Sequence, residues 1–342
     1  MADFYNFLIV VNLYICRFTK YYLEHFFCLI RIITNEILDK SEKNHKVFTD
    51  MVKNNQLSRE KIETYNIIQK NKCIYKYLGM KIDEKFFSNL ESIILFIGYS
   101  RSGHSLVGSL LDAHPEILVS HELHVVKHLM SGKSKSDILR SMAINSALFN
   151  KNGREYTGYD YSIKGQFQGK VKTLKIIGDK KGNGTIRLIR KYPDIVSLFV
   201  KFQVPVKLIH VIRNPYDNIS TRAKRNNTSL SYSAKGYFRN METISKLEKN
   251  PSFETHHVFL EDLIFQPSET LKKLLTYLKL KNQTESYIEA CKDRLFSNPK
   301  ETRFDFEWSS KDYNYVKNKI KKYEFLKRYQ NRSFNQKSSK IG

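Results

Sequence analysis

The chain has 342 residues, of which 41% are hydrophobic, and this is enough apolar material for one large core or two small ones. Its 58 Lys and Arg against 34 Asp and Glu give a net charge of +24, so an anionic substrate, cofactor, membrane surface or nucleic acid is the expected partner. The four cysteines, Cys16, Cys28, Cys73 and Cys291, lie far apart, which argues against a disulfide framework and against a CxxC zinc site.

Residues 1–38 are predicted to form a hydrophobic or amphipathic helix. Their clean apolar run, Phe4–Cys16, is shorter than the roughly 20 apolar residues that a spanning helix needs. Two interpretations stay open: a helix packed on the domain, or an interfacial or signal-anchor helix that associates residues 1–33 with a membrane. The expected location is therefore cytoplasmic or membrane-associated, a Golgi-type anchor being one form of the latter.

Three further segments follow. Residues 39–89 are polar and Lys-rich and are predicted to be a helical connector. Residues 90–330 are predicted to be the catalytic domain. Residues 331–342 are rich in Ser and Lys and are predicted to be a disordered tail.

The domain shows the alternation of strands and helices that is typical of an α/β sheet. Ser92–Gly98 is a short apolar run ended by glycine, as expected for a strand buried on both faces. Similar runs at 174–177, 206–212 and 257–260 are each followed by a helical pattern, which favours a parallel sheet. The leucine pattern after Pro267 predicts a further helix.

The loop after the first strand, Gly98-Tyr-Ser-Arg-Ser-Gly-His-Ser105, leads into an apolar helix. Backbone N–H groups at a helix N-terminus bind anions, and glycine lets the chain approach them closely. The spacing fits the nucleoside-triphosphate pattern GxxxxGK[ST], but His104 stands in place of the lysine and a basic residue, Arg101, comes three positions earlier. This change favours a donor other than a nucleoside triphosphate with magnesium.

Ser100–Ser105 resembles the 5′-phosphosulfate loop of sulfotransferases, [PS]-[KR]-S-G-[TS]-[TS], except at His104. The resemblance implies the P-loop-NTPase-like sulfotransferase fold, a three-layer α/β sandwich with a central, mostly parallel sheet. It also implies 3′-phosphoadenosine 5′-phosphosulfate (PAPS) as donor, without a metal. The donor contacts carried over from this loop are Arg101, Ser102, Gly103, His104 and Ser105.

A second anion site is predicted where the strand 206–212 ends, in Arg213-Asn-Pro-Tyr-Asp-Asn-Ile-Ser-Thr-Arg222. An arginine at a strand end can hold a phosphate in a bidentate manner. The segment resembles the 3′-phosphate motif of sulfotransferases, R-[DN]-P-x-[DE]-x-x-x-[ST]. This implies that Arg213 and Thr221 hold the 3′-phosphate of PAPS, with Arg225 as a further contact and Ser220 as the alternative to Thr221.

Two more segments extend the resemblance over about residues 92–330. Leu260–Pro267 is similar to the family's Y-E-D-L-x-x-x-P segment, with leucine in place of the tyrosine. Phe304–Trp308 is similar to its closing W-S segment.

Sulfuryl transfer needs a base for the acceptor proton and positive charge at the bridging oxygen. Leu111-Asp-Ala-His-Pro115 and the acidic residue after it resemble tyrosine and bacterial-type sulfotransferases. There the base is a glutamate twenty-one positions after the basic residue of the loop, which implies Glu122. Arg101 is the expected stabiliser of the bridging oxygen and Lys180 the contact to the sulfuryl oxygens. His121 stays an alternative base, because cytosolic sulfotransferases use a histidine.

Two other functions are considered. A degenerate P-loop kinase or NTPase would need a Walker lysine and a clear acidic magnesium ligand at a strand end, and we identify neither in the sequence. A non-enzymatic polyanion-binding protein would need clustered basic residues, whereas here they are spread evenly, so no nucleic-acid partner is expected. The hydroxyl acceptor stays open between carbohydrate, tyrosine and small molecule.

Overall fold

The computed structural model describes residues 82–281 and 284–330. The predicted N-terminal helix, residues 39–81 of the connector and the predicted tail lie outside these residues. Apart from residues 155–159, the described residues belong to one compact unit. Within them, no helix combines the length and the apolar character needed to cross a bilayer.

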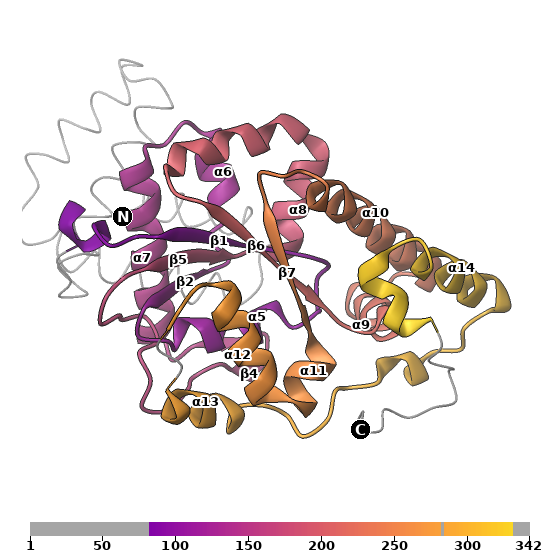
Figure 1. Ribbon diagram of the computed structural model, residues 1–342. Helices are drawn as coiled ribbons and strands as arrows, with labels where there is room; N and C mark the ends of the chain where they lie inside the picture. Colours follow the sequence, from indigo (N-terminus) through magenta and orange to yellow (C-terminus); the bar gives the residue numbers. More distant parts are fainter. Residues whose placement is uncertain (1–81, 282–283, 331–342) are drawn as a thin grey trace, which may run out of the picture. The chain divides into compact units, whose positions relative to one another are not determined.

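A five-stranded parallel sheet lies at the centre of this unit (Figure 1). The strand order is β2-β5-β1-β6-β7, and every neighbouring pair is parallel. The strands are β1 (Ser92–Ile97), β2 (Ile117–His121), β5 (Ile176–Lys180), β6 (Val206–Ile212) and β7 (Glu254–Phe259). All residues of β1, β2, β5 and β6 are buried, because helices cover both faces of the sheet.

Helices form a layer on each side of the sheet (Figure 1). On one side α5 (His104–Asp112), α12 (Pro267–Tyr277) and α13 (Glu285–Lys292) share a single apolar cluster with the sheet. On the other side lie α8 (Gly182–Lys191) and α10 (Leu230–Glu248). The predicted three-layer α/β fold with a parallel sheet is confirmed.

Shorter elements complete the described chain. The remaining helices are α6 (Val125–Met130), α7 (Lys135–Lys151), α9 (Pro215–Asn226), α11 (Leu260–Phe265) and α14 (Ser310–Ile320). Four 3₁₀ segments are η1 (Glu84–Phe87), η2 (Pro193–Phe202), η3 (Thr302–Asp305) and η4 (Glu324–Tyr329), and β3 (Glu155–Tyr156) pairs with β4 (Tyr159–Asp160) in a separate two-stranded sheet.

The first described residues already pack on the unit. Ile82 and Phe87 are buried, and Glu84 forms an ion pair of 2.7 Å with Arg140 of α7. The predicted domain boundary at residue 90 and the other predicted boundaries stay predictions.

Three strands differ from their predicted extents. The sequence analysis did not predict β2, whose three apolar residues are followed by Ser120 and His121. β5 begins two residues later than predicted and continues through Lys180. β7 ends at Phe259, because Leu260 begins α11. β2 and β5 therefore end in the polar residues Ser120, His121, Asp179 and Lys180 at the carboxyl edge of the sheet, where ligands bind in open α/β sheets.

Candidate active site

The loop Gly98–Gly103 joins β1 to α5 at the carboxyl edge of the sheet. Its φ angles are 139° at Gly98, 73° at Arg101 and 104° at Gly103, so the chain curls back repeatedly. Such a curl directs successive N–H groups into one concavity, next to the free N–H groups of the first turn of α5. A side chain at position 103 would be strained, because its φ of 104° is one that residues with a Cβ rarely adopt, and the Cβ would also lie 2.9 Å from Leu260 Cδ1. The loop is thus shaped to receive an anion.

Asn218 of α9 fixes this loop from outside. Its side-chain Nδ2 donates to the Ser100 carbonyl oxygen at 2.7 Å. The Ser102 hydroxyl lies 2.7 Å from the Tyr99 carbonyl oxygen and 2.9 Å from Asn218 Oδ1. Because the buried Ser102 hydroxyl is engaged inside the protein, its backbone N–H is the group left for a ligand.

His104 is directed into the fold. Its Nε2 lies 3.0 Å from the Ile97 carbonyl oxygen, and burial, with Lys180 contributing, lowers its pKa to about 4. The neutral ring fills space that two glycines leave open: a Cβ at Gly98 or Gly182 would lie 2.7 Å or 2.4 Å from Nε2. The imidazole therefore does not replace a Walker lysine, and the backbone N–H of His104 is the group available to a donor.

Arg213, at the end of β6, is held by groups from three segments. Its guanidinium donates to Thr221 Oγ1 at 3.0 Å and to Thr302 Oγ1 at 3.4 Å, and also to the Lys300 carbonyl oxygen. One nitrogen lies 3.5 Å from the Arg101 carbonyl oxygen of the loop. The predicted pair of Arg213 and Thr221 is therefore brought together beside the loop.

The alternatives around Thr221 are placed differently. Ser220 is fully buried, and its hydroxyl oxygen has no hydrogen-bond partner among the described residues. Arg225 lies one helical turn after Thr221 and is exposed. The geometry favours Thr221 over Ser220 as the neighbour of Arg213.

Residues 300–303, which the sequence analysis missed, also belong to the cluster around Arg213. The Arg303 backbone N–H and guanidinium both donate to the Asp217 carboxylate, at 2.8 Å and 2.5 Å. Thr302 donates to the Asp217 carbonyl oxygen at 2.8 Å. Burial raises the pKa of Asp217 to about 6, although Arg213 and Arg303 oppose this. No local sequence pattern marks Thr302 or Arg303, because their partners lie more than eighty residues earlier.

A second cluster forms at the other end of the loop around Glu122. Lys180, only 2% exposed, donates to Glu122 Oε1 at 2.7 Å and to Ser105 Oγ at 3.0 Å. Lys181 donates to the other carboxylate oxygen of Glu122. His121 Nε2 lies 3.3 Å from the Lys180 ammonium. The structure thus brings together Glu122, Lys180 and Ser105, which the sequence analysis assigned to the site, and His121, its alternative base.

The charges in this cluster are strongly coupled. Burial raises the pKa of Glu122, but Lys180 and Lys181 outweigh it and bring the pKa to about 2. Burial lowers the pKa of Lys180, and Glu122 opposes that shift. Without a ligand, Glu122 is therefore an ionised partner of two cations and a weak base.

Asp179 positions the segment that carries Glu122. Its buried carboxylate accepts hydrogen bonds from Leu123 N at 3.2 Å, Val125 N at 2.8 Å and Ser120 Oγ at 2.9 Å. Glu122 itself has a left-handed backbone, φ 58°, which costs energy for a residue with a side chain. Burial raises the pKa of Asp179 to about 6 in spite of these hydrogen bonds. The sequence analysis missed Asp179, although a carboxylate next to Lys180 at a strand end was a usable signal.

The other histidines of this region are packed in the fold. The His121 ring stacks on Phe149 with 3.9 Å between centroids. His114 is fully buried against Tyr287 and accepts a hydrogen bond from Glu116 N. Packing of this kind orients His121 toward Lys180 rather than toward solvent.

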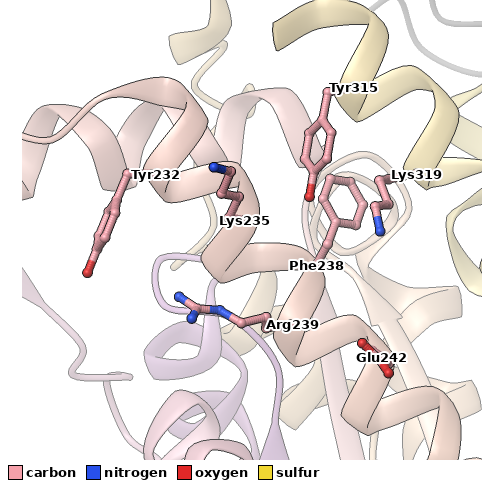
Figure 2. A pocket seen from close by; sticks show the side chains of 7 residues that line it. All are labelled: Tyr232, Lys235, Phe238, Arg239, Glu242, Tyr315 and Lys319. Atoms are coloured by element: carbon pink, nitrogen blue, oxygen red, sulfur yellow. The ribbon is translucent and has the colours of Figure 1, made fainter.

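A separate pocket of about 360 Å³ lies between α10 and α14. Figure 2 shows the seven side chains that line it: Tyr232, Lys235, Phe238, Arg239, Glu242, Tyr315 and Lys319. Three of them are basic and one is acidic, so the pocket favours an anionic group. None of the predicted donor contacts is among its described lining residues.

Fold and site together define an α/β protein with an anion-binding loop at the carboxyl edge of a parallel sheet. The Arg101 carbonyl oxygen of the loop lies 3.5 Å from Arg213, and Ser105 at the start of α5 contacts Lys180, which in turn contacts Glu122. Such a site can hold a donor with two anionic groups and place one of them beside a carboxylate.

The comparison with known proteins agrees with this class. The chain is 24% identical to the protein-tyrosine sulfotransferase of Drosophila melanogaster over 229 residues, which cover 60% of this chain. The match spans 42% of the fly protein. No protein-family model matches the chain. This similarity to a sulfotransferase agrees with the resemblance found in the sequence.

Three solved sulfotransferases are also similar to the chain. The sulfotransferase domain of the Synechococcus PCC 7002 olefin synthase is 15% identical, with 64% of this chain and 84% of that chain covered and a TM-score of 0.38. STF9 from Mycobacterium avium is 8% identical, with 73% and 80% covered and a TM-score of 0.40. Mouse SULT7A1, solved with PAP, is 12% identical, with 70% and 89% covered and a TM-score of 0.40.

Proposed function

We propose that this protein transfers a sulfuryl group from PAPS to a hydroxyl acceptor and releases PAP. The observation that carries the proposal is the position of one anion-binding loop between two clusters. Arg213 and Thr221 lie at one end of the loop, and Lys180 and Glu122 lie at the other. PAPS carries a phosphate and a phosphosulfate, which two such clusters can hold separately.

The donor contacts follow from this arrangement. Arg213 and Thr221 hold the 3′-phosphate, with Arg225 as an outer cation. The loop binds the 5′-phosphosulfate through the backbone N–H groups of residues 102–105 and the side chain of Arg101. No metal ligand is needed, because fixed cations take the charge of the leaving group.

The reaction forms one S–O bond and breaks another. The acceptor oxygen attacks sulfur, the bond between sulfur and the 5′-phosphate oxygen breaks, and PAP leaves with the bonding electron pair. Glu122 takes the acceptor proton. Arg101 stabilises the charge on the bridging oxygen, and Lys180 stabilises the sulfuryl oxygens.

Donor binding also makes Glu122 a better base. Lys180 contacts both Glu122 and Ser105 of the loop, so sulfuryl oxygens at the loop compete with Glu122 for this ammonium. Loss of that partner raises the pKa of Glu122 from its ligand-free value of about 2. The carboxylate then accepts a proton only when the donor is in place.

The donor is tested by calorimetry with PAP. Arg213→Ala removes a bidentate contact to phosphate, and we expect binding to weaken by roughly 2–4 kcal/mol, or about 30- to 1000-fold. Arg140→Ala, which removes the same charge at an ion pair on α7, is the matched control and should leave PAP affinity unchanged. Binding of ATP as tight as that of PAP, together with a need for magnesium, would show a kinase-like donor site instead.

The acceptor class is tested by incubation with radiolabelled PAPS and a panel of carbohydrate, tyrosine-containing and small-molecule hydroxyl acceptors. Transfer of label to one class identifies it. Binding of PAP without label transfer to any acceptor hydroxyl would contradict the proposed transferase reaction with these acceptors.

A further inference from the structure

Three side chains converge on the α10 side of the sheet, away from the loop. His210 on β6 and His257 on β7 are direct neighbours in the parallel register, and Glu248 is the last residue of α10. One nitrogen of each histidine and one carboxylate oxygen of Glu248 all lie within 4.8 Å of one another. The three donors come from three separate elements, so their convergence is a property of the tertiary structure.

The buried member of this cluster lacks an internal partner. His210 is 1% exposed, and its Nδ1 has no hydrogen-bond partner among the described residues. Burial lowers the pKa of His210 well below its ordinary value, so the ring is neutral and keeps a lone pair. Buried polar atoms are nearly always satisfied, and a ligand at this point would satisfy Nδ1.

Glu248 and His257, the two partly exposed members of the cluster, also have atoms without a hydrogen-bond partner among the described residues. His257 Nε2 lies 3.1 Å from Glu248 Oε1, and neither Oε1 nor His257 Nδ1 forms a hydrogen bond within the described part of the chain. Two ligand atoms of a tetrahedral zinc ion, each about 2.0–2.1 Å from the metal, lie roughly 3.3 Å apart. The separation of this pair is therefore close to that of two zinc ligands.

We propose that His210, Glu248 and His257 bind a Zn²⁺ ion, with water as fourth ligand. Two imidazoles and one carboxylate are ligands that zinc prefers, whereas magnesium and calcium prefer oxygen alone. The sequence analysis expected no metal, because PAPS needs no metal bridge, and these three residues form no spacing motif that would mark the site. The site is independent of the proposed sulfuryl transfer.

The ion would join β6, the edge strand β7 and the end of α10. Asn240 of α10 donates to the Gly98 carbonyl oxygen at 3.2 Å, next to the start of the anion loop. A metal at Glu248 therefore stabilises the same helix that supports the loop. We infer a structural role for the ion, not a catalytic one.

The test measures zinc bound to the untagged, full chain. The protein is stripped with a chelator, equilibrated with Zn²⁺, desalted and analysed by elemental mass spectrometry. His257→Gln and Glu248→Gln change partly exposed side chains, so both variants should fold, and circular dichroism checks this. His256→Gln is the control, because His256 lies on the same strand but stacks on Tyr277 at the opposite face.

We expect wild type and His256→Gln to hold one more equivalent of zinc than His257→Gln and Glu248→Gln. Zinc at about 100-fold above its Kd should raise the Tm of the first two by roughly 5–10 °C and leave the other two unchanged. Substitution by Co²⁺ should give the visible absorption of a tetrahedral site in wild type, and this absorption should be absent from His257→Gln and Glu248→Gln. Equal zinc content in all four proteins would overturn the proposal, whatever the sulfotransferase activity shows.

Discussion

Glu122 is the residue on which the proposed chemistry depends, and two lysines determine its state. Their positive charge outweighs burial and holds the carboxylate ionised. His121 lies beside Lys180 and stacks on Phe149. Both residues are therefore close to the same ammonium, and substitutions must separate them.

Replacement of Glu122 by glutamine should separate catalysis from binding. Glu122→Gln keeps the size of the side chain but cannot accept a proton, so we expect turnover to fall by about 10²–10⁴. PAP affinity, measured by calorimetry, should change little. His121→Ala is the comparison variant. Loss of turnover in His121→Ala with an active Glu122→Gln would assign the histidine as the base.

The pH dependence of catalysis should change when Lys181 is replaced. A carboxyl group with a lowered pKa stabilises the fold above its ordinary pKa of 4.5, and this contribution is lost as the pH falls through about 2. Lys181→Gln removes one of the two cations, so the pKa of Glu122 should rise. The acid limb of kcat/KM against pH should therefore move to higher pH. Lys172→Gln, at an exposed lysine, is the control, and an unshifted limb in Lys181→Gln would show that Lys181 does not act on the base.

At the scale of elements, β1, α5 and α8 meet around the His104 ring. His104 begins α5 and contacts the last carbonyl of β1. Gly182 begins α8 and leaves room for the ring. Its φ does not require glycine, so the clash of a Cβ with His104 is what excludes a side chain there. The departure from the family's hydroxyl residue at position 104 is thus matched by a glycine far away in the sequence.

This steric fit predicts that the effect of Gly182→Ala on stability depends on the residue at position 104. Gly182→Ala in the wild type forces a Cβ to 2.4 Å from His104 Nε2, and we expect it to lower the free energy of unfolding by roughly 1–3 kcal/mol. In a His104→Ser background the space is free, and alanine in a helix should be neutral or stabilising by about 0.5–1 kcal/mol. Chemical denaturation of the four proteins measures the coupling. Equal effects of Gly182→Ala in both backgrounds would refute the steric explanation.

At the scale of the whole molecule, the net charge of +24 acts on every anionic ligand. The basic residues are spread along the chain, so they create a broad positive potential that attracts a donor with several negative charges. This effect is distinct from the contacts of Arg213 and Lys180, because salt screens it over a Debye length of about 8–10 Å.

We therefore expect the association rate of PAP to fall steeply with ionic strength. Stopped-flow measurements from low to high salt should show a decrease of at least about 10-fold. Adenosine, which lacks the phosphates, should show little dependence and is the control ligand. The same salt dependence for both ligands would mean that salt acts on the protein and not on the electrostatic attraction.

The sequence by itself determined the features that depend on neighbouring residues. The apolar runs of β1 and β6, the glycine-rich loop before α5 and the Arg213–Thr221 spacing are all local, because strand burial, helix N-termini and helical periodicity act over a few residues. The loop and the parallel sheet could therefore be predicted. β2 was not predicted, because its three apolar residues are followed by Ser120 and His121 and give no clear strand pattern.

Only the tertiary structure decided which residues far apart in the sequence form hydrogen bonds, ion pairs or steric contacts. Asp179 holds residues 123 and 125 from 54 to 56 positions away, and Thr302 reaches Arg213 across 89 positions. The orientation of His104 into the fold and the convergence of His210 with Glu248 likewise depend on how helices pack on the sheet. Such contacts carry no local sequence period, because their energy comes from burial and pairing after the chain has folded.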